Sequence, residues 1–148
     1  MAELTRKEVI MVINGSERPR LAGVDLSSVD LIRLDLEGAN LRGARLQGAK
    51  LNEAILRNSN MTGVDMTGAQ ATYADFDKAN LIAGNLTVAN LSGARLTGVN
   101  LTNAILNGAN LYGASLKGAI VAGVKFDEAT VWPDGKKGPA GTPTSYTG

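Results

Sequence analysis

Five aspartates at spacings that are multiples of five residues are the first candidates for a catalytic or cation-binding role in this sequence. They are Asp25, Asp30, Asp35, Asp65 and Asp75. Paired carboxylates can act as general acid and base, or can hold a cation. The sequence contains no histidine and no cysteine, so it lacks the commonest general base, the commonest metal ligand and a thiol nucleophile. We therefore predict that the protein is not an enzyme and has no catalytic, cofactor-binding or metal-binding residues and no cofactor.

The aspartates belong to a five-residue repeat that we read without a gap from Val24 to Pro133. It gives 22 units, in which the third residue is leucine in 15 and the first is alanine in 14. A period of five fits neither a helix nor a long strand, but it fits a chain that turns a corner every five residues. We expect the first and third side chains to face a common axis. Glycine, in half of the fifth positions, eases the turns.

Charged residues twenty positions apart indicate how many units complete one coil. Outward side chains at this spacing form seven pairs of opposite sign and none of like sign: Asp25/Arg45, Arg45/Asp65, Asp30/Lys50, Arg33/Glu53, Glu37/Arg57, Arg57/Asp77 and Asp75/Arg95. Unlike charges stabilise neighbouring strands and like charges destabilise them. Four units per coil are therefore favoured, which gives about 5.5 coils from 22 units. We interpret the aspartates as salt-bridging residues, each exposed pair contributing about 0–1 kcal/mol.

Units such as ANLRG (39–43), ADFDK (74–78) and ANLYG (109–113) resemble the pentapeptide-repeat family. The start, LTRKEVIMVINGS, and the end, TVWPDG, are similar to members that are common in cyanobacteria. The resemblance covers about three quarters of the chain. It implies an all-β fold: a right-handed quadrilateral β-helix, a solenoid with the third and first residues inside. It implies no catalytic residues. Most members have no known function, some protect type II topoisomerases by resembling DNA, and others regulate differentiation by binding proteins.

The two ends differ in composition from the repeat. Thr5 and Glu8 fit a capping box, and Gly15 is a stop signal, so we predict a short α-helix over about residues 6–14. Residues 1–18 then form a capping helix and loop that cover the first coil of the β-helix, residues 19–133. A targeting helix is the competing interpretation. Residues 134–148 are rich in proline and glycine, which predicts a flexible, extended or disordered tail.

Charge and hydropathy limit the classes of partner. With 15 basic and 14 acidic residues, the chain lacks the basic excess typical of nucleic-acid binders, so we do not expect nucleic acid as its partner. The same balance disfavours the alternative function, a DNA mimic that modulates gyrase. The sequence contains no run of about 18 apolar residues, which a membrane-spanning helix would require, so we predict no membrane span. We expect a cytoplasmic monomer that acts as a regulatory or interaction scaffold and whose partner is another protein.

Two groups of outward residues are candidates for function. The first is an apolar patch on one face, which we predict to bind the partner: Ile32, Tyr73, Tyr112 and Trp132. The competing interpretation is that Tyr112 and Trp132 stack on each other and are covered by the tail. The second group is a column at twenty-residue spacing: Asn40, Asn60, Asn80 and Asn100. We expect these amides to bond one another as a structural ladder rather than to bind a ligand.

Overall fold

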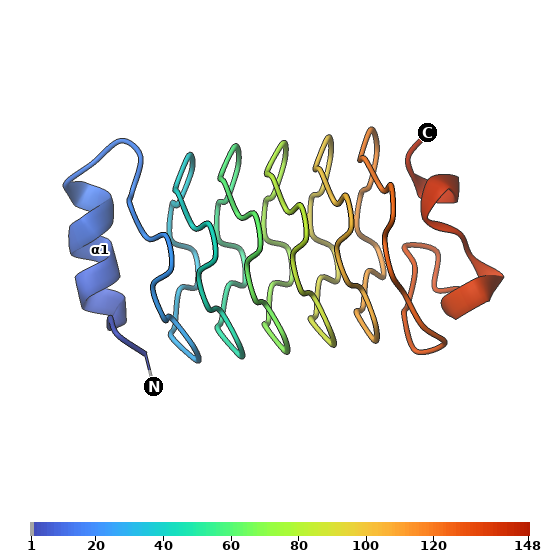
Figure 1. Ribbon diagram of the computed structural model, residues 1–148, viewed down its shortest axis with the longest axis horizontal. Coiled ribbons are helices and arrows are strands. Elements are labelled where there is room, and N and C mark those ends of the chain that lie inside the picture. The colour runs from blue at the N-terminus through green and yellow to red at the C-terminus, as the bar shows by residue number, and fades with distance from the viewer. Residues whose placement is uncertain (1) are drawn as a thin grey trace.

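The computed structural model describes residues 2–148, which form a stack of coils closed at both ends by helical segments (Figure 1). Helix α1 spans Arg6–Asn14. At the other end lie two 3-10 helices, η1 over Gly138–Ala140 and η2 over Pro143–Tyr146. No helix among these residues is long and apolar enough to cross a membrane.

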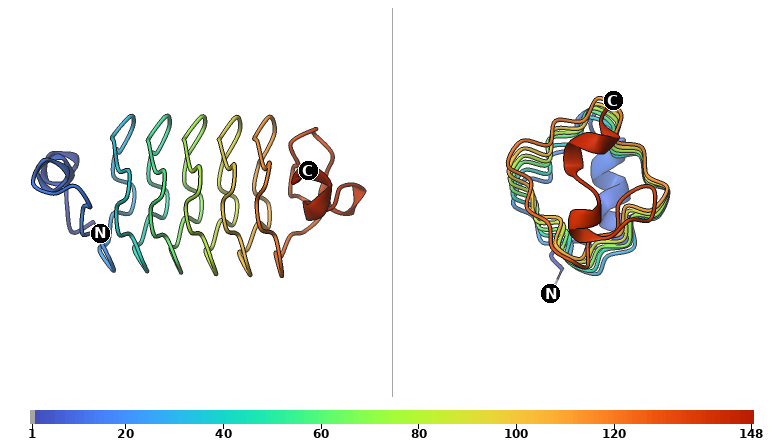
Figure 2. Two further views of the ribbon diagram at one scale, coloured as in Figure 1. Left: turned by 90° about the horizontal axis from the view of Figure 1, so that it is seen from above. Right: turned by 90° about the vertical axis from the view of Figure 1, so that its right-hand side faces the viewer.

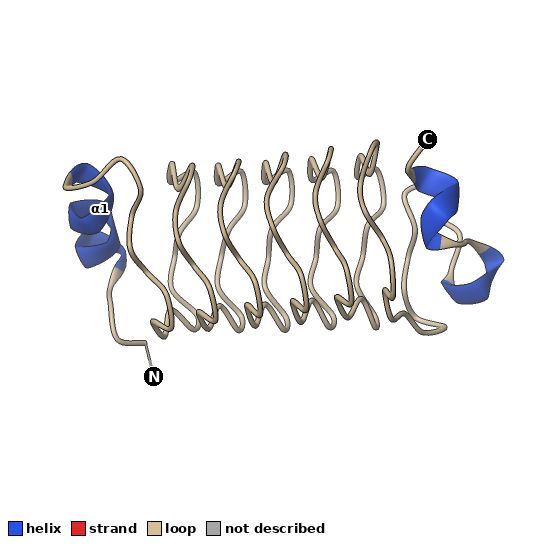
Figure 3. Ribbon diagram, turned by 45° about the horizontal axis from the view of Figure 1, so that its top comes forward, coloured by secondary structure: helices blue, strands red, loops and turns tan. Residues whose placement is uncertain are grey.

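Each coil contains four units and is joined to the next by backbone hydrogen bonds. Parallel bridges pair residues twenty apart, from Arg20 with Asn40 to Ile105 with Lys125, which agrees with the spacing of the charges. Figure 2 shows the four-sided outline of the coils along the stack. The bridges are isolated, and residues 2–148 contain no continuous strand (Figure 3). The β-structure that we predicted is therefore present as coils joined by single β-bridges, without a sheet. The right-handed sense of the coils stays a prediction.

The third-position side chains fill the axis of the stack. Leucines such as Leu41, Leu81 and Leu91 have no exposed surface, and the first-position alanines pack beside them. Burial of one leucine side chain contributes about 1.5–3 kcal/mol. Because almost every unit supplies one such side chain, the core extends without interruption from the first coil to the last.

A tight turn follows the third residue of each unit. In the unit that begins at Ala39, the N–H of Ala44 donates to the carbonyl of Leu41 at 2.9 Å, and Gly43 has a φ of 66°. A positive φ at this position is typical of a type II turn and favours glycine. Nine fifth positions nevertheless hold another residue at positive φ: Ser28, Arg33, Glu53, Asn58, Tyr73, Lys78, Ala83, Val88 and Asn103. These residues adopt a backbone conformation that costs L-amino acids free energy.

The side chain at the second position holds the same turn. The Oδ1 atom of Asp65 accepts from the N–H of Thr67 at 3.0 Å, and Asn60 bonds Thr62 in the same way at 3.1 Å. The other aspartates at this position repeat the contact: Asp25, Asp30, Asp35 and Asp75. This is an Asx turn, which only a short side chain with an acceptor oxygen can form. The repeat therefore prefers asparagine or aspartate here for a local structural reason.

Helix α1 covers the N-terminal end of the stack, as predicted. Its capping box joins Thr5 and Glu8 reciprocally, and its Val9 is fully buried. The Nη1 atom of Arg6 donates to the carbonyls of Asp30 and Ile32 and to the Asp30 carboxylate. These contacts fix the helix to the first coil.

The last coil contains one extra residue, so the uninterrupted repeat that we predicted up to Pro133 is wrong for its final unit. Asn110 pairs with Val131, 21 positions later and not 20. Thr130 takes the small inward position, and its hydroxyl donates to the carbonyl of Leu106 at 2.8 Å. Trp132 consequently takes the third position and points into the core, where it has no exposed surface.

The C-terminal segment folds back over the end of the stack instead of extending away from it. The indole of Trp132 packs edge-on against Phe126, with ring centroids 5.2 Å apart, and stacks on Tyr146 at 5.6 Å. Its Nε1 atom donates to the carbonyl of Gly138 at 2.8 Å, and the N–H of Gly118 donates to the carbonyl of Thr147 at 2.8 Å. Residues 134–148 thus form a packed cap, in contrast to the disordered tail expected from their composition.

Candidate interaction surface

One face of the stack carries the two exposed tyrosines, and we call it the tyrosine face. It consists of residues 29–33, 49–53, 69–73, 89–93 and 109–113. Tyr73 is 70% exposed and Tyr112 is 61% exposed. Ile32 is half-buried beside the Arg6 contact. Trp132, which we predicted to join this surface, lies in the core because of the extra residue in the last coil.

Tyr73 lies along the stack and covers the next coil. It occupies a fifth position with a φ of 58°. A β-carbon placed on Gly93 would come within 2.5 Å of its Cε1 atom, so the tyrosine ring rests against the backbone of Gly93. Glycine at this point is what allows the contact. The ring is therefore supported on one side and open to solvent on the other.

Tyr112 lies at the border between the tyrosine face and the C-terminal cap. Its N–H donates to Oδ1 of Asn110 at 3.0 Å, which fixes the turn that carries it. A β-carbon placed on Gly135 would lie 3.5 Å from the Cε2 atom of its ring. The expected stacking of Tyr112 on Trp132 does not occur in residues 2–148, because the indole contacts Phe126 and Tyr146 instead.

The charged side chains pair with one another, but mostly along diagonals. Of the seven predicted pairs only Arg33 and Glu53 form a salt bridge within residues 2–148, at 3.1 Å. The two other salt bridges within the repeat join residues eighteen positions apart: Arg57 with Asp75, and Arg95 with Asp77 at 2.6 Å. The second carboxylate oxygen of Asp75 is available because the first holds the Asx turn. The hydrogen bond and the charge of Asp75 raise the pKa of Arg57 above its ordinary value.

The carboxylates are thus used within the stack. The hydroxyl and the N–H of Ser27 hydrogen-bond the carboxylate of Asp25 and lower its pKa. In the described part of the chain, no group of three or more potential ligands is arranged to hold a metal ion.

The four asparagines of the predicted ladder lie in one column, paired through their backbones. Each Oδ1 atom accepts from the N–H two residues later, at Arg42, Thr62, Ile82 and Thr102. The amide-to-amide bonds that we expected are absent from residues 2–148. The asparagine oxygens hold the turns, and the Nδ2 groups remain as outward donors.

Comparisons with known proteins agree on one family. The sequence profile described as Pentapeptide repeats matches in overlapping segments: residues 20–58, 56–87, 85–121 and 94–130. A search of curated protein sequences found no match. Among solved structures, a pentapeptide repeat protein (Rfr23) from the cyanobacterium Cyanothece 51142 is 27% identical, with a TM-score of 0.56. The match covers 86% of this chain and 99% of that one.

Two further structures are similar. A pentapeptide repeat protein from the thylakoid lumen of Arabidopsis thaliana is 38% identical, with a TM-score of 0.54, and the match covers 71% of this chain and 70% of that one. HetL from Nostoc, a pentapeptide repeat protein involved in the regulation of heterocyst differentiation, is 32% identical with a TM-score of 0.34. That match covers 80% of this chain and 61% of HetL.

Proposed function

Because the chain belongs to the pentapeptide repeat family, whose scaffolds are generally non-catalytic, we propose that it is a non-enzymatic interaction scaffold. It binds another protein, as a regulator or an assembly platform, through the tyrosine face. The observation that carries this proposal is the pair of exposed tyrosines, Tyr73 and Tyr112, on one face of a preformed stack.

The two tyrosines have the properties of binding hot spots. Each combines a large apolar ring with a hydroxyl, and aromatic side chains dominate the energy of many protein interfaces. The ring of Tyr73 already rests on Gly93, and that of Tyr112 borders Gly135. Side chains held in place before binding lose little conformational entropy when a partner arrives. The partner expected from this surface is a protein patch that is largely apolar and has polar groups for two phenol hydroxyls.

The remaining exposed apolar side chains are scattered. Met11 lies on α1, Val88 lies in a turn of one face, and Ile120 lies on another face, with exposures of 65%, 56% and 50%. None of them has a second large apolar neighbour on its own face comparable to the tyrosine pair. We therefore place the interaction at the tyrosines.

The test is affinity capture from the native host with matched variants. Tyr73→Ala/Tyr112→Ala removes both rings, and Met11→Ala/Ile120→Ala removes two other largely exposed apolar side chains elsewhere. We expect the tyrosine variant to lose the protein that wild type captures, while the control retains it, both at unchanged melting temperature. Capture of the same protein at full strength by the folded tyrosine variant would exclude this face as the binding surface.

The finer features of this function stay part of the proposal. We propose a monomer that acts in the cytoplasm, although the plant relative is a thylakoid-lumen protein. Gyrase modulation by DNA mimicry is not favoured, because residues 24–133 contain nine basic and ten acidic side chains and so lack an acidic excess.

A further inference from the structure

One corner of the stack differs from the others in its charge. There the fifth positions of one face run beside the second positions of the next: Arg18, Gly38, Asn58, Lys78 and Gly98 beside Arg20, Asn40, Asn60, Asn80 and Asn100. We call this edge the donor corner. It contains three cationic side chains and no carboxylate, whereas the corresponding positions at each of the other three corners include at least one aspartate.

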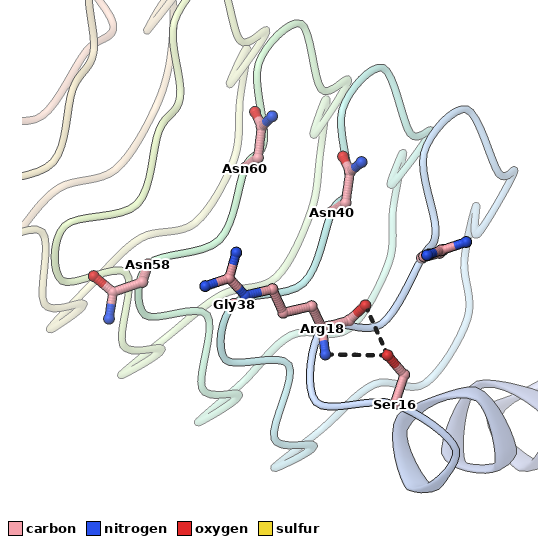
Figure 4. A pocket seen from close by; sticks show the side chains of 7 residues that line it. Ser16, Arg18, Gly38, Asn40, Asn58 and Asn60 are labelled. Carbon is pink, nitrogen blue, oxygen red and sulfur yellow. Dashed lines mark hydrogen bonds between the residues drawn. The ribbon is translucent and has the colours of Figure 1, made fainter.

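A groove of about 520 Å³ lies at the N-terminal end of the donor corner (Figure 4). Gly38 opens it, because a residue without a side chain stands between Arg18 and Asn58 in that column. Polar residues form the rest of the lining: Ser16, Arg18, Arg20, Asn40, Asn58 and Asn60. Figure 4 shows the Arg18 side chain extending along the groove toward Asn58. The volume lies within the range of about 300–1,000 Å³ that is usual for small-molecule sites.

The lining offers mainly hydrogen-bond donors. The Oδ1 atoms of Asn40 and Asn60 are occupied by the N–H groups of Arg42 and Thr62, so the Nδ2 groups are the part of each amide left for a ligand. The guanidinium groups of Arg18 and Arg20 form no ion pair within residues 2–148. The groove therefore presents two positively charged guanidinium groups and several neutral N–H donors.

Acidic residues lie near the groove but do not line it. Glu17 and Glu37 line a neighbouring hollow together with Asp35, and this hollow shares only Ser16 with the groove. The positive charge of Arg18 and Arg20 is therefore not neutralised by a carboxylate in the groove lining.

We propose that this groove binds the phosphate group of a small ligand. Guanidinium forks match phosphate oxygens in pairs, and charge-assisted hydrogen bonds of this kind are stronger than neutral ones. A phosphate has three terminal oxygens and can use more of the donors than the two oxygens of a carboxylate can. The site lies on a different edge from the tyrosine face, so it does not depend on the function proposed above.

The sharpest test exchanges donors for acceptors without changing the turns. Asn40→Asp/Asn60→Asp keeps the Oδ1 atom of each Asx turn, as the native aspartates at second positions do, but replaces each Nδ2 group by a carboxylate oxygen. ¹H–¹⁵N spectra of the full chain are recorded while inorganic pyrophosphate or phosphate is added at constant ionic strength. We expect saturable shifts of the side-chain amides of Asn40, Asn58 and Asn60 in wild type. The variant should bind pyrophosphate at least roughly tenfold more weakly.

The matched control is Asn90→Asp/Asn110→Asp, which makes the same exchange in two Asx turns on the tyrosine face. Its affinity for pyrophosphate should stay within roughly twofold of wild type. Arg18→Gln/Arg20→Gln should also abolish the saturable shifts, and acetate should not produce them. The proposal is wrong if pyrophosphate causes no saturable shift, if both asparagine pairs weaken it equally, or if the arginine variant binds like wild type.

Discussion

Trp132 provides the strongest test of the C-terminal cap. Its indole is fully buried between Phe126 and Tyr146, and its Nε1 atom donates to the carbonyl of Gly138. Removal of a buried aromatic side chain costs about 3–5 kcal/mol. Trp132→Phe keeps a ring in the site but leaves the Gly138 carbonyl without its donor, which costs about 1–3 kcal/mol. We therefore expect Trp132→Ala to cost about 3–5 kcal/mol of unfolding free energy and Trp132→Phe roughly half as much.

Urea titration measures these differences as shifts of the unfolding midpoint at constant slope. Hydrogen exchange of the Gly118 N–H, which bonds the carbonyl of Thr147, shows whether the cap opens before the rest of the stack. Truncation after Asp134 should have a similar effect, since it removes both Tyr146 and Gly138. Tyr112→Ala is the control, because its ring is 61% exposed and such changes usually stay within about 0.5 kcal/mol. If Trp132→Ala proved no more destabilising than Tyr112→Ala, the register shift that buries the indole would be refuted.

Three further predictions concern strain, protonation and packing. Val88→Gly should raise the unfolding free energy in urea by about 1 kcal/mol, because Val88 has a φ of 51° and a left-handed β-branched residue is strained; a decrease would contradict this. The hydrogen bond from the N–H of Lys136 is the main cause that lowers the pKa of Asp134, and the hydrogen bond from the Tyr146 hydroxyl adds to it. Burial is the main cause that raises the pKa of Tyr146, and its hydrogen bond to Asp134 adds to it. The cap should therefore lose stability as pH falls below about 4 and as it rises above about 10. Hydrogen exchange of the cap amides, corrected for intrinsic rates, should detect both losses of stability. The loss at low pH should be absent in Asp134→Asn, and the loss at high pH should be absent in Tyr146→Phe. Ala71→Leu should cost about 1–3 kcal/mol by overpacking beside Phe76, against about 2–5 kcal/mol for Leu91→Ala, which leaves a cavity; stabilisation by Ala71→Leu in thermal unfolding would show spare space in that layer.

The sequence was sufficient to predict the parts of the fold that rest on repetition. The leucines that occupy most third positions and the alanines that occupy most first positions could only be buried along a common axis, and the structure has them there. Opposite charges at a spacing of twenty gave the number of units in a coil correctly. The pairs themselves were mostly wrong, since Arg57 and Arg95 reach carboxylates eighteen positions away. A column of opposite charges indicates which residues lie above one another in the stack. A long arginine side chain, however, bonds the nearest carboxylate oxygen that is free, which can belong to another column.

The candidate site was only partly predictable, because one inserted residue shifts the register of the side chains that follow it. Continuing the period of five through Ala129 placed Trp132 outside and Val131 inside, whereas the structure has them the other way round. A signal was present: with one residue inserted, Thr130 matches the small first position, and the largest apolar side chain becomes a core residue. Burial of an indole is a stronger constraint than continuity of the repeat at its end.

The structure also explains which positions are free to carry function. The core fixes the first and third residues of each unit, while the backbone bridge and the Asx turn fix the backbone and the side-chain oxygen of the second. The fifth residue of most units adopts a positive φ, a backbone conformation that costs any residue other than glycine free energy. Tyr73 is one of these residues, and its ring covers a glycine in the next coil. Because this turn favours glycine, the ring of Tyr73 is not needed to form it, and its exposed side is free to contact the partner that we propose.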